Sequence, residues 1–83
     1  MIDIILARYQ EDINWILPNR NLFDNVYVFN KGSQVPFDDS FKVENLLNLG
    51  REAGTYFYFL SNYYDTIEDD KIYIFTNLLI LQF

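Results

Sequence analysis

Short apolar runs separated by polar turns are the main feature of this chain. Runs that are apolar almost throughout are typical of strands buried on both faces of a sheet. Glycine, asparagine, lysine and acidic residues between the runs mark the turns. We expect four strands, at Ile2–Ala7, Asn25–Asn30, Lys42–Leu47 and Lys71–Phe75, the last able to continue to Leu81.

Two segments have helical spacing instead. The first follows the first strand, and we expect Pro18 to end it, because a proline inside a helix removes a backbone donor. Its apolar positions, at i, i+3 and i+4, are Ile13, Ile16 and Leu17. The second is expected to begin just after Gly50 and to end by Asp65.

The longer helix has apolar residues that the spacing places on one face. They are Ala53, Tyr56, Phe57, Leu60, Tyr63, Tyr64 and Ile67. We expect the stripe formed by Tyr56, Phe57, Leu60 and Tyr64 to lie in the core.

The element order β-α-β-β-α-β predicts an α/β fold with a small parallel sheet and helices on both faces. Right-handed crossovers then favour the strand order 3-2-1-4, as in one half of a doubly wound, Rossmann-like sheet. The length, 83 residues, fits a single domain over 1–83. Ligands of such sheets bind beyond the carboxyl ends of the strands, so the loops that follow strands are the candidate site.

Composition narrows the functions that this domain can have. Apolar residues make up 51% of the chain, with eight Phe and seven Tyr, which excludes a disordered protein. The net charge of −6, with single, scattered basic residues, argues against a nucleic-acid groove. The chain has no cysteine and no histidine, so thiolate and imidazole metal sites and Ser-His or Cys-His nucleophile pairs are excluded.

Neither a signal peptide nor a membrane span is expected. The start lacks a basic segment, and the apolar tail 72–83 is shorter than the ~20 residues that a membrane helix needs. The absence of cysteine fits a reducing compartment, so we expect a cytoplasmic protein.

Three loops carry polar residues in an orderly way: Arg8 to Asp12, Asn30 to Ser33, and Asn48 to Glu52. With their flanks they read LARYQEDINWI, VYVFNKGS, NLGREAGTYFYFLSNYYD and IYIFTN. This series resembles a widespread family of uncharacterised proteins that read ARYNEDLSWL, then YNKG, then NVGREAHTYL. The same order also resembles the nucleotide-binding N-terminal half of GT-A-type glycosyltransferases, over residues 2–77.

The resemblance implies a site for a nucleotide sugar, with Mg²⁺ or Mn²⁺ as the accompanying ion. Tyr9 and Glu11 would border the base and ribose, and Asn30 would stand near them in place of the usual aspartate. The entrance of the long helix, formed by Asn48, Gly50 and Arg51, would face the diphosphate with backbone N–H groups and a guanidinium.

The chain also departs from this pattern. Gln10 replaces the asparagine after the tyrosine, and Thr76-Asn77-Leu78 stands where these enzymes have an Asp-x-Asp metal clamp. The relatives continue beyond the position of Phe83. We therefore expect no dedicated metal site, assign no catalytic residue, and expect a truncated or inactive domain unless a partner completes it.

Structural interpretations remain open for each of these residues. Glu11 and Asp12 can be first-turn acids, Arg51 and Glu52 a solvated pair, and Lys31-Gly32-Ser33 an ordinary turn. The acidic residues at 38–39 and 68–70 are expected to be solvated. A second functional hypothesis is a small interaction module whose exposed sheet edges pair with another chain, as a homo-oligomer joined through Ile72–Phe75 and Leu78–Leu81.

Overall fold

The computed structural model describes residues 1–47, 52–68 and 70–76, without the side chains of 52, 53 and 66. It contains a four-stranded, all-parallel sheet in the order β3-β2-β1-β4, which confirms the predicted fold and strand order. The strands are β1 (Ile2–Arg8), β2 (Asn25–Asn30), β3 (Phe41–Asn45) and β4 (Ile72–Thr76). The helices are the 3₁₀ helix η1 (Asn14–Leu22), α1 (Glu52–Asn62) and the 3₁₀ turn η2 (Tyr64–Thr66).

Strand β1 is the centre of the sheet. It pairs in parallel with β2 on one side and with β4 on the other, so that Leu6 lies opposite both Val28 and Thr76. All residues of β1 after Ile2 are buried, which explains why its sequence is apolar on both faces.

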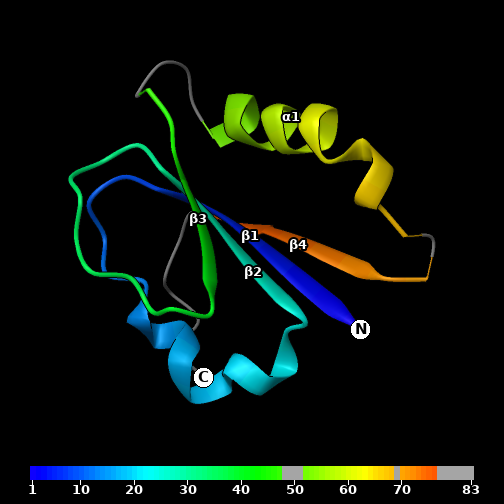
Figure 1. Cartoon of the computed structure of the whole chain (residues 1–83), viewed down its shortest axis with the longest axis horizontal. Coiled ribbons are helices and arrows are strands. Elements are labelled where there is room, and N and C mark those ends of the chain that lie inside the picture. The colour runs from blue at the N-terminus through cyan, green and yellow to red at the C-terminus, as the bar shows by residue number, and fades with distance from the viewer. Residues whose placement is uncertain (48–51, 69, 77–83) are drawn as a thin grey trace.

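The two faces of the sheet are covered by different helices, α1 on one side and η1 on the other (Figure 1). On the η1 face, Ile13 and Ile16 pack against Ile4, Leu6, Val26, Val28 and Phe41. On the α1 face, Phe59 packs against Ile5, Tyr27 and Phe29. The predicted arrangement with helices on both faces is therefore confirmed.

Helix η1 has a kink directly after Pro18, where the first helix was expected to end, and a second helical segment then follows in place of the expected turn. The 3₁₀ helix contains Pro18 and continues to Leu22, with non-helical angles at Asn19 (φ −117°, ψ 21°). A proline removes only one i→i−3 bond from so short a helix. The next turn has other support, because Arg20 donates from Nη1 to the carbonyl of Phe23 (2.6 Å) and accepts a bond from the Phe23 N–H (3.1 Å).

The prediction that the stripe of Tyr56, Phe57, Leu60 and Tyr64 lies in the core was wrong for three of these four residues. Phe57, Leu60 and Tyr64 are 65%, 42% and 76% exposed, whereas Thr55 and Phe59 are buried. Aromatic residues occur all around this helix, so their spacing does not select one face. Ring packing selects it instead: Phe59 lies 5.1 Å from Tyr27 and 5.0 Å from Tyr63, centroid to centroid.

Candidate functional site

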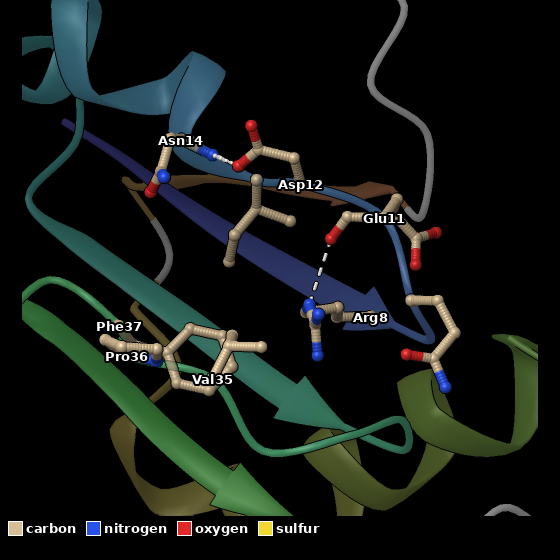
Figure 2. Close-up of a pocket in the computed structure, with 9 residues that line it drawn as sticks. Arg8, Glu11, Asp12, Asn14, Val35, Pro36 and Phe37 are labelled. Carbon is tan, nitrogen blue, oxygen red and sulfur yellow. Dashed lines mark hydrogen bonds between the residues drawn. The ribbon is translucent and has the colours of Figure 1, made fainter.

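One pocket among the described residues lies at the carboxyl ends of β1 and β2. It has a volume of about 470 Å³ and lies between the segment that follows β1 and the loop that joins β2 to β3 (Figure 2). This is the edge of the sheet where parallel α/β folds bind ligands. Its lining consists of Arg8, Gln10, Glu11, Asp12, Ile13, Asn14, Val35, Pro36 and Phe37.

Arg8, the last residue of β1, is the buried cation of this pocket. It is 4% exposed, and its guanidinium donates to three neutral oxygens. Nε donates to the carbonyl of Glu11 (2.9 Å), and Nη1 donates to Asn30 Oδ1 (2.7 Å) and to the carbonyl of Ser33 (2.8 Å). The guanidinium also lies 5.4 Å from the ring centroid of Phe37. Among the described residues, Arg8 has no carboxylate within ion-pair distance.

Asn30 holds the two loops together rather than lining the pocket. It is 2% exposed, and Oδ1 accepts from Arg8 Nη1 and from the Gly32 N–H (3.2 Å). Its Nδ2 faces four acceptors at 3.0–3.3 Å, the nearest being Asn45 Oδ1. In this structure its polar atoms are occupied by the protein, so its side chain positions Arg8.

Of the other predicted base and ribose residues, Glu11 lines the pocket and Tyr9 does not. Glu11 Oε1 accepts a bond from the backbone N–H of Tyr9 (2.6 Å), while the ammonium of Lys31 lies 5.6 Å from the Tyr9 ring centroid. Asp12 Oδ1 accepts from the backbone N–H of Asn14 (2.9 Å), where η1 begins. Both carboxylates thus have local structural bonds.

The Lys31-Gly32-Ser33 turn lies tightly against the segment after β1. A Cβ on Gly32 would be 1.3 Å from the carbonyl oxygen of Tyr9, so only glycine fits this approach. Ser33 Oγ adds a hydrogen bond to Gln10 Oε1 (2.8 Å). The turn therefore fixes the two loops that form the pocket.

The predicted diphosphate residues Asn48, Gly50 and Arg51 lie outside the described residues. A second pocket of about 330 Å³ lies on the α1 face of the sheet. It is lined by Lys31, Leu46, Leu47, Gly54, Thr55 and Tyr58. The sequence indicated no role for Thr55 and indicated mainly a turn at Lys31. Nothing in the sequence around these two residues shows that both are buried.

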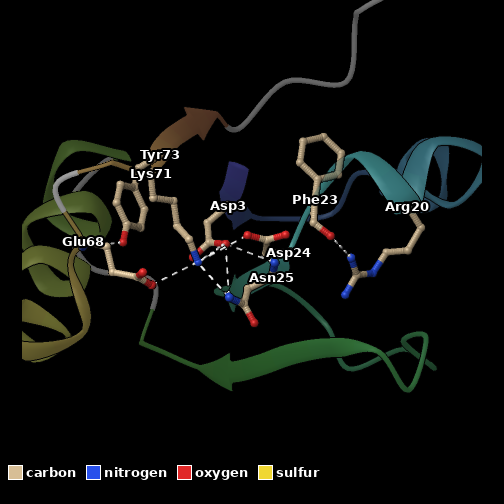
Figure 3. A network of polar contacts seen from close by, with 8 residues as sticks. All are labelled: Asp3, Arg20, Phe23, Asp24, Asn25, Glu68, Lys71 and Tyr73. Atoms are coloured by element: carbon tan, nitrogen blue, oxygen red, sulfur yellow. Dashed lines mark hydrogen bonds and ion pairs between the residues drawn. The ribbon is translucent and has the colours of Figure 1, made fainter. Parts of the chain in front are cut away.

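A cluster of charged residues occupies the opposite, amino end of the sheet (Figure 3). Lys71 Nζ lies 3.3 Å from Asp3, 3.5 Å from Asp24 and 3.4 Å from Glu68. Burial alone lowers the pKa of Lys71, but the hydrogen bond and charge of Asp3, with those of Glu68, raise it above its usual value. This network links the starts of β1, β2 and β4 and is structural.

The described residues hold no group of three or more acidic side chains that could bind a metal ion. None of the helices in the described part of the chain is long and apolar enough to cross a membrane. Comparison with protein-family models, curated proteins and solved structures finds no match to the chain. Its function is therefore inferred from the site itself.

Proposed function

We propose that this domain binds a nucleotide sugar in the pocket at the carboxyl ends of β1 and β2, as a glycosyltransferase-like domain. The sequence resemblance supports the ligand class, and the fold supports the position of the pocket. We propose binding without assigning catalysis, and the cytoplasm as its location.

The observation that supports this proposal most directly is the environment of Arg8. A guanidinium removed from water is costly unless its charge is compensated, and hydrogen bonds to neutral oxygens compensate it only in part. Arg8 is 4% exposed and has only such oxygens around it among the described residues. A phosphate of the ligand would supply the missing negative charge by accepting from Nη2, whose two N–H groups are not used by these bonds.

The rest of the pocket suits the uncharged parts of such a ligand. Val35 and Phe37 form an apolar wall opposite the polar segment after β1 (Figure 2). The second carboxylate oxygen of Glu11 can accept a bond from a ribose hydroxyl while the first remains with Tyr9. Asn30 has the role of positioning Arg8.

The described residues of the pocket form no dedicated metal cage. Its two carboxylates, Glu11 and Asp12, each accept a backbone N–H bond, and no third acidic side chain joins them in the described part of the chain. A cage made of protein ligands alone needs more oxygen ligands than this, whereas Mg²⁺ beside a diphosphate is held by one or two carboxylates together with phosphate oxygens and water. The proposal therefore assigns no metal ion to the pocket in the absence of the nucleotide sugar.

Titration of UDP, GDP and their sugars followed by amide NMR shifts tests the proposal. We expect shifts at Arg8, Glu11, Val35 and Phe37. Shifts confined to residues 68–71, or none at millimolar ligand, would contradict it.

Two substitutions give the matched control. Val35→Trp fills the pocket from a residue that is 37% exposed, and should abolish binding while the protein stays folded. Val43→Trp adds the same bulk at a residue of β3 that is 36% exposed and outside the pocket, and should leave binding unchanged. Equal effects of both variants would refute the assignment.

A second function, pairing with another copy of the chain, is favoured by the two edges of the sheet. The β3 edge contains Lys42 and Glu44, charges of the kind that prevent edge pairing, whereas β4 has no charged residue. Ile72 and Ile74 of β4 are also 60% and 39% exposed. We propose a homodimer joined at β4; the expected contribution of Leu78–Leu81 lies outside the described residues.

Sedimentation equilibrium distinguishes this dimer from a monomer. Ile74→Lys should convert the dimer to monomer by placing a charge at the edge, and Val43→Lys on β3 should not. A monomer at high micromolar concentration in the unsubstituted protein would refute dimerisation.

A further inference from the structure

The pocket on the α1 face has its own polar groups, separate from those around Arg8. It lies between the first turn of α1, the residue that follows β2 and the residues that follow β3. Its apolar wall is formed by Leu46, Leu47 and Tyr58. The question is which ligand suits the polar groups that face this wall.

Thr55 provides the first of them. Thr55 is 1% exposed, and its Oγ1 has no hydrogen-bond partner among the described residues. Leaving a buried hydroxyl unsatisfied costs free energy, so such a group in a folded protein usually has a role that the protein alone does not show. Thr55 is among the residues that line the pocket.

Lys31 provides a positive charge at the same pocket. It is 8% exposed, and its backbone N–H is fixed by a bond to the carbonyl of Arg8 (2.8 Å). The ring of Tyr9, whose centroid lies 5.6 Å from the ammonium, stabilises the charge through a cation–π contact. The side chain is therefore held at the end of β2, beside the start of α1.

The start of α1 adds the third feature. The helix begins at Glu52 and has 11 residues, and the N–H groups of its first turn have no acceptor within the helix. They give this end a partial positive charge that favours anions. Gly54, in the same turn, has open space where a Cβ would stand, which leaves room for a ligand.

We propose that this pocket binds the phosphoryl group of a phosphate ester. Its polar groups can all donate: an ammonium, a hydroxyl and helix N–H groups. The hydroxyl of Tyr58 already donates its proton to Glu44, so it is not counted among the donors. A phosphoryl group has several strong acceptor oxygens for these donors, and the leucine and tyrosine wall covers the organic part of the ester. The site lies on the other face of the sheet from the Arg8 pocket and does not depend on the nucleotide-sugar proposal.

Inorganic phosphate and phenyl phosphate are suitable probes, with benzoate as an anion that has no phosphoryl group. Amide NMR titrations should show shifts at Lys31, Gly54 and Thr55 with both phosphates, and tighter binding of phenyl phosphate because its ring contacts the apolar wall. Equal binding of benzoate, or no shift at these residues with either phosphate, would overturn the proposal. Nucleotide-sugar shifts at Arg8, together with no phosphate shifts at Lys31, Gly54 and Thr55, would leave the first proposal standing and refute this one.

Thr55→Val is the most diagnostic variant, because it keeps the shape of the side chain and removes only the hydroxyl. We expect phosphate affinity to fall about fivefold, the effect of losing one hydrogen bond. The free protein should become no less stable, because the unsatisfied hydroxyl is gone. A structural role for the hydroxyl would instead lower stability and leave the affinity unchanged.

Two further pairs of variants test the charge and the space. Lys31→Met should weaken phosphate binding more than tenfold, and Lys42→Met, the same charge change outside the pocket, should not. Gly54→Ala should bind as the parent does, whereas Gly54→Leu should block the pocket. Equal affinity of all four variants would refute the site.

Discussion

Replacing Phe59 with alanine should come close to unfolding the protein, whereas the same change at Phe57, two residues away, should be nearly neutral. The two phenylalanines are on the same helix and are equal in size. Phe59 is 0% exposed and Phe57 is 65% exposed. The comparison therefore tests which face of α1 packs on the sheet.

The magnitude follows from what Phe59 contacts. Its ring lies within 6.3 Å, centroid to centroid, of the rings of Tyr27, Phe29, Tyr63, Tyr73 and Phe75. Removing a fully buried phenylalanine costs about 3–5 kcal/mol, through lost transfer free energy and the cavity that remains. The total free energy of unfolding of a domain this small is about 4–12 kcal/mol. Phe57→Ala, at an exposed site, should change it by less than about 0.5 kcal/mol.

Urea unfolding of the parent and both variants, followed by circular dichroism, measures these differences. We expect the Phe59→Ala midpoint to fall sharply, or the variant to be largely unfolded without urea, and the Phe57→Ala midpoint to stay with the parent. Similar losses in both variants would mean that α1 packs with a different face. A larger loss for Phe57→Ala would restore the predicted stripe of Tyr56, Phe57, Leu60 and Tyr64.

Two other predictions concern glycine and alkaline pH. Gly32→Ala should destabilise the fold by about 2 kcal/mol or more, because the added methyl group clashes with the Tyr9 carbonyl. Gly54→Ala should stabilise α1 by up to about 1 kcal/mol. Thermal unfolding measures both effects. Burial, followed by the hydrogen bond and charge of Glu44, raises the pKa of Tyr63 to about 12, and the pKa of Lys71 is raised as well. A pKa that is higher in the folded than in the unfolded protein stabilises the fold. This stabilisation is complete below the pKa of the unfolded protein, about 10, and is lost as the pH rises through the pKa of the folded protein. Urea midpoints should therefore fall above about pH 10, and a midpoint that stays constant to about pH 12 would contradict the raised values.

The fold was predictable because the strands of a doubly covered sheet have a distinct sequence. Strand β1 is apolar at nearly every position because β2, β4 and a helix on each face surround it. Once four such runs and two helices are placed along the chain, the preference for right-handed connections favours the strand order 3-2-1-4. Strand bounds shifted by one or two residues, as at β3, which ends at Asn45 because its partner there, Asn30, is the last residue of β2.

The face of α1 was not predictable, for a physical reason. Spacing identifies the buried face only when the other face is polar, and α1 has aromatic residues on all sides. The stacked rings of Phe59 and Tyr63 decide the orientation, and those contacts depend on Tyr27 and Phe29 of a strand far away in sequence.

The edge of the sheet at which the pocket lies was predictable, but the contacts of the residues around it were not. Ligands of parallel sheets bind beyond the carboxyl ends of the strands, and Glu11 is among the residues that line the pocket at this edge. Burial decided the rest: Asn30 is enclosed by its own loop, and Arg8 is buried beside it. A cation at the end of a buried strand is the signal that could have identified Arg8.

The two ends of the sheet use their cations in opposite ways. At the amino end, Lys71 meets three carboxylates. At the carboxyl end, Arg8 meets no carboxylate in the described part of the chain. Glu11 and Asp12 are nevertheless within four residues of it, and the chain has twice as many acidic as basic residues, 12 against 6. Those two carboxylates bond to backbone N–H groups instead. In a chain with this excess of negative charge, a buried arginine without a carboxylate partner is best explained by an anion that comes from outside the protein.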